Sequence, residues 1–432
     1  MVYFFVFSSA LKKEDKMKKV NPFLEKQAIS PDGNFREIKE LSLVPYDKKT
    51  ASPYTKIRMI LMNGTEFESN WFLHQFSRHC NNNDLRREIA NIRRHEQQQQ
   101  KMISSMKPVD ETDLETTIAY EQLAVDLTAI LAQHVKDENV KSALNFALLE
   151  DFDHLYRFAN LIEAEEGVDS SKLVGKYTEI MPGRPTIAEH RHPYDSINKF
   201  VCNMSADPFT KLAVNIITAA EQQTMNYYMN VSNLHTTETG KKLYAEIAMI
   251  EEQHVTEYGS LLDTNASWLE NWVMHEYTEC YLYYSCYADE SDENIKKVYE
   301  RLYYEECGHL QKAAELLEKY EGKHWTCLYP CGGDFPELLK FGENIEYIRD
   351  VLKNTINLTK HRECYIDVKK LDEDSDFKKY NGKVCKNPKG VPSHTVIENY
   401  VKKNGEDYRF QVKEHPIKEL ADRKNDNTTI AR

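Results

Sequence analysis

Residues 148–156 read LLEDFDHLY, with an acid and a histidine three positions apart in an apolar stretch. On a helix the side chains of Asp151 and His154 share one face and can bind one metal ion together. Another acid, Glu121, precedes Asp151 by 30 residues, and turn-forming residues 136–139 lie midway between them. The segment therefore predicts a helical hairpin that brings Glu121 level with Asp151 and His154, because two antiparallel helices of equal length place residues equally distant from the turn beside each other.

This spacing occurs four times along the chain. A shift of 155 residues lays SPYTK (52–56) on DPFTK (207–211), and the match continues without a gap to residue 163 of the earlier copy. A shift of 55 residues relates the two hairpins within each copy. The four sets, each with two acids and a third position, are Glu66/Glu96/Gln99, Glu121/Asp151/His154, Glu221/Glu251/His254 and Glu276/Glu306/His309. The helical region is therefore a tandem duplication in which the first hairpin lacks its histidine.

The sequence predicts a mainly α protein in which four helical hairpins build bundles and a small C-terminal α+β appendage follows. Prolines and glycines interrupt the helical periodicity before, between and after the two copies. The expected segments are an irregular N-terminal arm (1–52), the first helical half (53–166), a crossover (167–207), the second helical half (208–320) and the C-terminal appendage (321–432). In the appendage we expect short strands, for example at 407–412.

The composition limits the class of protein. The 432 residues include 69 acidic and 56 basic side chains, and the formal net charge is −13. Nucleic acids and anionic membranes attract basic surfaces, so neither is an expected partner. No apolar run approaches the roughly 18 residues of a membrane-spanning helix, and the start of the chain lacks the pattern of a signal peptide. Nine scattered cysteines are typical of a reducing compartment, so we expect a cytoplasmic protein.

The repeated acids lie on apolar helical faces, where an ionised carboxylate is costly unless a cation accompanies it. Several carboxylates at one level would repel each other, and a pair of bound metal ions would remove that cost. A mixture of imidazole and carboxylate suits iron, manganese or zinc better than calcium or magnesium. We expect two iron ions, with manganese as the alternative.

Nine residues are the stronger candidate ligands, and three are weaker because a neutral amide replaces the histidine of their hairpin. The stronger set is Glu121, Asp151, His154, Glu221, Glu251, His254, Glu276, Glu306 and His309, and the weaker set is Glu66, Glu96 and Gln99.

Together with LLEDFDHLY, five further stretches resemble the ferritin-like di-iron carboxylate superfamily, which includes rubrerythrins, ferritins, bacterial di-iron monooxygenases and manganese catalases. These stretches are AYEQLAVDL (119–127), AAEQQTMNY (219–227) with IEEQHVTEY (250–258), and MHEYTECYL (274–282) with YEECGHLQK (304–312). The resemblance covers about 270 residues, from 53 to 320. It implies a four-helix bundle with a dinuclear site.

Within that resemblance, the first acid of each hairpin (121, 221, 276) is implied to be a terminal or bridging ligand. Each acid-x-x-His pair (151/154, 251/254, 306/309) is implied to supply a bridging carboxylate and a terminal imidazole. The chain departs from the family pattern in having four hairpins instead of two, in lacking the paired CxxC motifs of rubrerythrin's electron relay, and in Asp151, where glutamate is usual.

The hairpins can pair in two ways. If each half folds alone, the first site combines the Glu66 and Glu121 hairpins and the second combines the Glu221 and Glu276 hairpins. If the two middle hairpins pair instead, Glu121, Asp151, His154, Glu221, Glu251 and His254 form one site and the outer hairpins form a weaker equivalent. Ferritin-like bundles need a long connection between their hairpins, and residues 155–220 can provide it, which favours the second arrangement.

The resemblance implies a di-iron oxidoreductase that activates dioxygen or peroxide. Its expected partners are a small-molecule oxidant or substrate and a separate electron donor, and homo-oligomerisation stays open. The alternatives are metal storage or detoxification, or a structural helical protein without catalysis.

Three other features have competing interpretations. The crossover stretch MPGRPTIAEHRHPYD (181–195) caps the site, binds an anionic substrate or forms an ordered surface loop. The tyrosines between 277 and 304 either carry electrons or pack in the core with their hydroxyls bonded at its edge. The acid-x-x-His pairs Glu189/His192 and Glu321/His324 are interpreted as chance matches.

Overall fold

The computed structural model describes residues 19–184, 186–387 and 390–404. It confirms the predicted mainly α fold with a small C-terminal α+β part. The strand predicted at 407–412 and the apolar start of the chain lie outside the described residues.

The four predicted hairpins form, and each turn lies where the sequence predicts it. Their helices are α1 (Pro53–His79) with α2 (Asn83–Ser105), α3 (Asp113–His134) with α4 (Glu138–Glu165), α6 (Pro208–Leu234) with α7 (Glu238–Gly259), and α8 (Trp268–Asp289) with α9 (Glu293–Glu321).

Equivalent residues start the second helix of every hairpin. The side chains of Asn82, Asp137, Thr237 and Asp292 accept hydrogen bonds from backbone N–H groups in the first turns of α2, α4, α7 and α9. These N–H groups have no partner inside their helix, so an N-cap oxygen stabilises the helix start. The shifts of 55 and 155 residues place the four N-cap residues at equivalent positions of the repeat. This explains why the turn lies at the same place in every hairpin.

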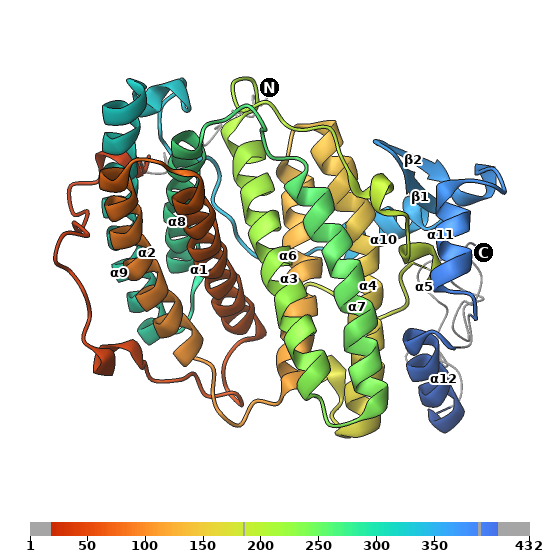
Figure 1. The fold of residues 1–432 in the computed structure, drawn as a ribbon. Coiled ribbons are helices and arrows are strands. Elements are labelled where there is room, and N and C mark those ends of the chain that lie inside the picture. Colours follow the sequence, from red (N-terminus) through yellow and green to blue (C-terminus); the bar gives the residue numbers. More distant parts are fainter. Residues whose placement is uncertain (1–18, 185, 388–389, 405–432) are drawn as a thin grey trace, which may run out of the picture.

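The hairpins assemble into two four-helix bundles that lie side by side (Figure 1). The middle bundle contains α3, α4, α6 and α7, and the outer bundle contains α1, α2, α8 and α9. Helix α1 packs on both α3 and α6, and α8 also contacts α6. Each bundle therefore takes one hairpin from each half of the duplication.

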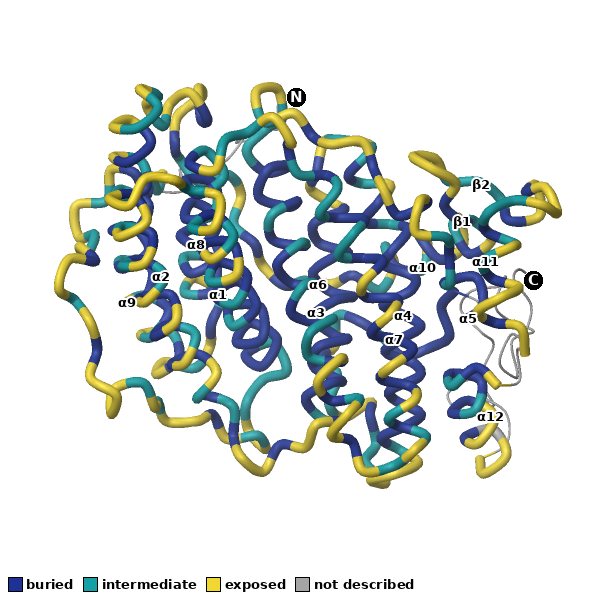
Figure 2. Tube along the Cα trace, viewed as in Figure 1, coloured by how far each residue is buried: buried dark blue, intermediate teal, exposed yellow. Residues whose placement is uncertain are grey.

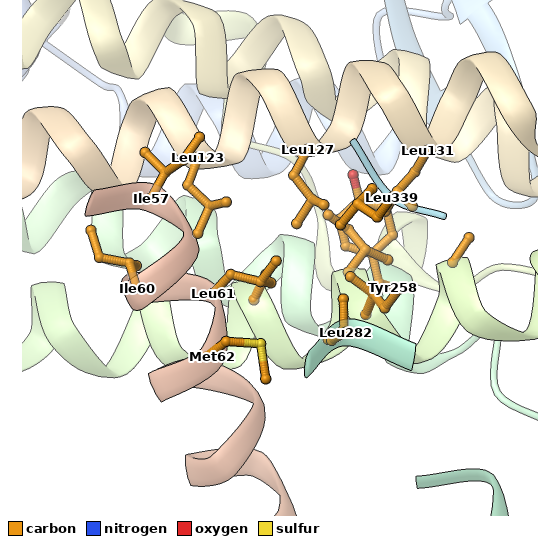
Figure 3. Packing of buried hydrophobic residues seen from close by; sticks show 14 of the residues in the cluster. Ile57, Ile60, Leu61, Met62, Leu123, Leu127, Leu131, Tyr258, Leu282 and Leu339 are labelled. Atoms are coloured by element: carbon orange, nitrogen blue, oxygen red, sulfur yellow. The ribbon is translucent and has the colours of Figure 1, made fainter. Parts of the chain in front are cut away.

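One hydrophobic core runs through both bundles. Figure 3 shows apolar side chains of α1, including Ile57 and Leu61, in the same cluster as Leu123 of α3 and Leu282 of α8. Almost every residue of α3 is buried, and most of α4 is buried as well (Figure 2). A helix with apolar residues on all sides is expected in the interior of a large protein.

The remaining segments cover the two bundles differently. In the N-terminal arm, short 3-10 turns at Pro22–Leu24 and Ile38–Leu41 lie against α9 and α2 of the outer bundle. The crossover contains α5 (Thr186–Glu189) and 3-10 turns at Ser170–Lys172 and Pro193–Ser196, which lie against α4 and α7 of the middle bundle.

The first part of the appendage contacts α8 and α9 of the outer bundle. Its later part lies against the middle bundle, where α10 contacts α4 and α12 contacts both α4 and α7. The elements of the appendage are α10 (Ile345–Thr355), the strands β1 (Leu358–His361) and β2 (Cys364–Asp367), α11 (Asp376–Val384) and α12 (Pro392–Asn404), with 3-10 turns at Trp325–Cys327 and Val368–Lys370. The strands pair antiparallel with Leu358 opposite Asp367.

Among the described residues, no helix combines the length and the apolar character that crossing a bilayer requires.

The N-terminal arm approaches α9 closely at Gly308. The backbone N–H of Ile29 donates a hydrogen bond to the carbonyl of Tyr304 at 2.8 Å, and a Cβ atom on Gly308 would overlap the carbonyl oxygen of Ile29. We therefore expect Gly308→Ala to lower the free energy of unfolding by about 1–3 kcal/mol through overpacking. Chemical denaturation measures the change. Gly259→Ala is the matched control, because its Cβ would meet no described atom within 4 Å, and an equal loss in both variants would contradict the prediction.

Candidate metal centres

The middle bundle buries a cluster of four carboxylates and two histidines, which we call the middle centre. Its residues are Glu121 on α3, Asp151 and His154 on α4, Glu221 on α6, and Glu251 and His254 on α7. All six side chains are at most 1% exposed. The cluster occurs because the two hairpins face each other with their acids at the same level.

The middle centre divides into two groups that share one residue. In the first group, Asp151, Glu221, Glu251 and His254 each offer a ligand atom within 4.8 Å of the others. In the second group, Glu121, His154 and Glu251 do the same. Glu251 belongs to both groups, so its carboxylate is placed to bridge two metal ions.

The outer bundle contains an equivalent cluster, which we call the outer centre. One group consists of Glu96, Glu276, Glu306 and His309, and the other of Glu66, Glu96 and Glu279. Here Glu96 is the shared residue. Gln99 is also fully buried, and its amide donates to Glu306 at 2.6 Å.

The structure therefore brings together the hairpins in the arrangement that the long crossover favours. The predicted ligand positions of hairpins two and three meet in the middle bundle, and those of hairpins one and four meet in the outer bundle. Neither half of the duplication closes a cluster alone. Among the members of these groups, Glu279 is the residue that the sequence did not predict as a ligand.

Both carboxylate oxygens of Glu221, and one oxygen of Glu121, accept no hydrogen bond from the residues that the structure describes. Burial, followed by the nearby acids, raises the pKa of Asp151 to about 7, and burial raises the pKa of Glu121 and Glu251 well above the usual value. Buried acids with unmatched oxygens are costly. A cation between them fits these residues, because it replaces the missing donors and offsets the repulsion.

The histidines of the middle centre direct Nδ1 toward the acids. His154 Nδ1 lies 3.0 Å from Glu251 Oε1, and His254 Nδ1 lies 3.1 Å from Glu251 Oε2. On the other side of its ring, His254 Nε2 lies 2.8 Å from Glu150 Oε2. A proton on Nε2, donated to Glu150, leaves the Nδ1 lone pair available for a metal ion.

A buried ionic network continues outward from Glu150. The guanidinium of Arg191 donates to both oxygens of Glu150, at 3.0 and 2.9 Å, and to Glu257 at 2.9 Å. Glu257 also accepts from Tyr365 at 3.0 Å and lies 3.2 Å from Lys360 Nζ. Burial raises the pKa of Glu150, but Arg191 and then His254 outweigh it and lower this pKa to about 2. Glu150 is therefore an ionised acceptor for His254.

The network shows which interpretation of the crossover stretch is correct. Arg184 and Arg191 are at most 1% exposed, so the stretch caps the middle bundle and is no surface loop. Glu189, interpreted from sequence as half of a chance pair, is also buried: one of its oxygens lies 3.5 Å from His154 Nε2, and the other accepts from Arg157 at 2.7 Å.

The tyrosine stripe of α8 is mainly core. Tyr277 and Tyr281 are fully buried and donate to the backbone carbonyls of Asp334 and Glu337, at 3.2 and 2.7 Å. Tyr283 is different, because its hydroxyl donates to Glu66 of the outer centre. The equivalent tyrosine of the middle bundle, Tyr228, donates to Glu121 at 2.5 Å.

Neither family models, nor curated proteins, nor solved structures gave a match to this chain. The candidate function therefore rests on the geometry of the centres.

We expect the metal-free protein to become less stable as the pH rises from 3.8 to about 7. Asp151 has an ordinary pKa near 3.8 and a folded pKa of about 7, so its protonated form stabilises the fold at low pH and this contribution is lost as the pH rises through 7. Each such group contributes a slope of up to about 1.4 kcal/mol per pH unit. Chemical denaturation at several pH values measures the slope.

Asp151→Asn should reduce that slope, and metal binding should oppose it because bound ions displace protons from the acids. Stability that rises with pH in the metal-free protein would contradict the prediction.

We expect Glu150→Gln to weaken metal binding at the middle centre by about 10- to 100-fold, the usual effect of removing a partner behind a metal-binding histidine. Titration of the metal-free protein with Fe(II) measures the affinity. The matched control is Glu305→Gln, the equivalent position of the outer bundle, which should leave the middle centre unchanged. Equal effects of both variants on the middle centre would show that Glu150 has no specific role.

Proposed function

We propose that the middle centre binds two iron ions and that the protein is a ferritin-like oxidoreductase acting on dioxygen or peroxide. The observation that carries this proposal is the fully buried set of four carboxylates and two imidazoles arranged as two groups around Glu251. Paired Glu and acid-x-x-His motifs projecting into a helical bundle are the ligand pattern of dinuclear carboxylate sites.

The charges support two divalent ions. The four ionised carboxylates Glu121, Asp151, Glu221 and Glu251 carry four negative charges, which two divalent cations neutralise. Each group contains one histidine, so each ion would receive one imidazole and two or more carboxylate oxygens. This mixture of ligands suits iron, with manganese as the alternative.

The bound iron would supply the electrons and the open coordination positions for reduction of the oxidant. The protein supplies the surroundings. Glu150 keeps the proton of His254 on Nε2, and the burial of all six ligands excludes water. The hydroxyl of Tyr228 donates to Glu121 and can deliver a proton at that oxygen. Tyr258 is fully buried, and its hydroxyl bonds to no described residue, so it is available to a small molecule at the centre.

The test is metal analysis of the purified protein, with absorption spectra recorded before and after exposure of the reduced form to air. We expect iron, a near-ultraviolet band that depends on oxidation, and loss of both from the middle centre in His254→Ala. Removal of one ligand should weaken binding by at least about tenfold, since loss of a mere supporting partner already does so.

His324→Ala is the matched control for that variant. Glu321 and His324 have the same spacing as the ligand pairs, but His324 is exposed at the end of α9, so its removal should leave iron and the spectrum unchanged. Zinc or no metal in the middle centre, or an unchanged spectrum in His254→Ala, would contradict the proposal. Iron that binds without any response to oxidant would favour storage over catalysis.

A further inference from the structure

The outer centre differs from the middle centre at two positions that the 155-residue shift makes equivalent. Gln99 stands where the middle centre has His254, and Glu279 stands where the middle centre has Ala124. The other five ligand positions keep a carboxylate or a histidine in both centres. The two differences lie on different hairpins, α1–α2 and α8–α9, but they affect the same half of the outer centre.

Gln99 keeps the supporting contact of the missing histidine, but it is an amide and supplies no imidazole. Its amide Nε2 lies 3.3 Å from Glu305, the equivalent of Glu150, and donates to Glu306 at 2.6 Å. Arg36 of the N-terminal arm pairs with Glu305, as Arg191 pairs with Glu150 in the middle bundle. Gln99 thus holds Glu306 in place, and the half of the centre near Glu66 has no imidazole.

Glu279 offers a further ligand atom in the half of the outer centre near Glu66. It lies three residues after Glu276 on α8, so both acids project from one helical face. The side chain is 0% exposed, and one of its oxygens lies within 4.8 Å of ligand atoms of Glu66 and Glu96. Neither of its oxygens accepts a hydrogen bond from the rest of the described chain. Ala124 at the equivalent position offers no ligand atom, so this carboxylate belongs to the outer centre alone.

We propose that Glu279 is a metal ligand that replaces the absent histidine of the first hairpin, and that the outer centre is a second dinuclear site whose preference is shifted from iron(II) toward manganese(II) relative to the middle centre. One ion would lie among Glu66, Glu96 and Glu279, and the other among Glu96, Glu276, Glu306 and His309.

The preference follows from the change in ligands. The outer centre offers five carboxylates and one imidazole, whereas the middle centre offers four carboxylates and two imidazoles. Oxygen-rich sites suit manganese, magnesium and calcium, and imidazole shifts the preference toward iron and zinc. The single remaining imidazole, on His309, favours manganese over the two ions that take all-oxygen shells.

The extra carboxylate also changes the charge that the metal ions must balance. With all acids ionised, two divalent ions neutralise the middle centre but leave one negative charge on the outer centre. The two centres would therefore differ in electrostatic potential as well as in ligand softness. For one and the same metal, the outer centre would favour the higher oxidation state more than the middle centre, because residual negative charge stabilises it.

The experiment uses the full chain, made metal-free and then incubated without oxygen with equal amounts of Fe(II) and Mn(II). After desalting, elemental analysis and electron paramagnetic resonance measure the retained metals. We expect both metals in the wild-type protein. Glu279→Ala, which gives the outer centre the residue found at Ala124, should lower manganese retention by about tenfold or more and leave iron in place.

A double variant tests selectivity directly. Gln99→His with Glu279→Ala gives the outer centre the four carboxylates and two imidazoles of the middle centre, and we expect iron to replace manganese there. Helical circular dichroism and the iron retained in the middle centre show that each variant is folded. Glu279→Ala also removes a buried unpaired carboxylate, so its metal-free form should be no less stable than the wild type.

The outcomes separate this inference from the proposed function. Unchanged manganese retention in Glu279→Ala, an outer centre that takes no metal, or equal proportions of iron and manganese in both centres would overturn the inference while the iron site stands. Manganese that depends on Glu279 in a protein whose middle centre binds no iron would overturn the proposed function and keep the inference.

Discussion

Mutual repulsion of buried carboxylates is the constraint on which both bundles depend. Nine acids of the two centres lie in apolar surroundings, at most 1% exposed, and hydrogen bonds satisfy only some of their oxygens. Without cations the cost of ionising them opposes folding; with cations the same acids hold four helices together at one level. The fold is therefore coupled to whatever charge balances these residues, and the proposed metal binding would contribute to the stability of each bundle.

The coupling extends outward through arginines. Behind each centre, an acid next to a ligand acid pairs with an arginine from a segment outside the bundle: Glu150 with Arg191 of the crossover, and Glu305 with Arg36 of the arm. The covering segments therefore fix the supporting acids of the centres as well as shielding the core. The middle centre receives the larger network, which reaches Lys360 and Tyr365 of the appendage.

Spacing in the sequence predicted most of the fold, because hairpin arms of equal length bring acids of fixed separation to one level. It favoured the observed pairing of the hairpins only through the length of the crossover, since the chain can connect either arrangement. It also missed residues outside the repeat grid. Glu279 follows Glu276 by three residues, a spacing that usually marks a solvated helical face, and Arg191 acts on Glu150 from a loop whose path no periodicity predicts. Glu150 and Glu305 directly precede Asp151 and Glu306 in the sequence, but only the packed structure shows which residues they support.

In the sequence, the two hairpins of the middle bundle lie between the two hairpins of the outer bundle. The middle bundle uses the continuous span from α3 to α7, whereas the outer bundle joins α1 and α2 to α8 and α9 across that span. During synthesis the middle bundle can close before α8 has been translated, while the first hairpin waits for a partner that arrives last. The acids of α1 and α2 thus stay without their partner helices for longest, and the outer bundle closes only after α8 and α9 have been made.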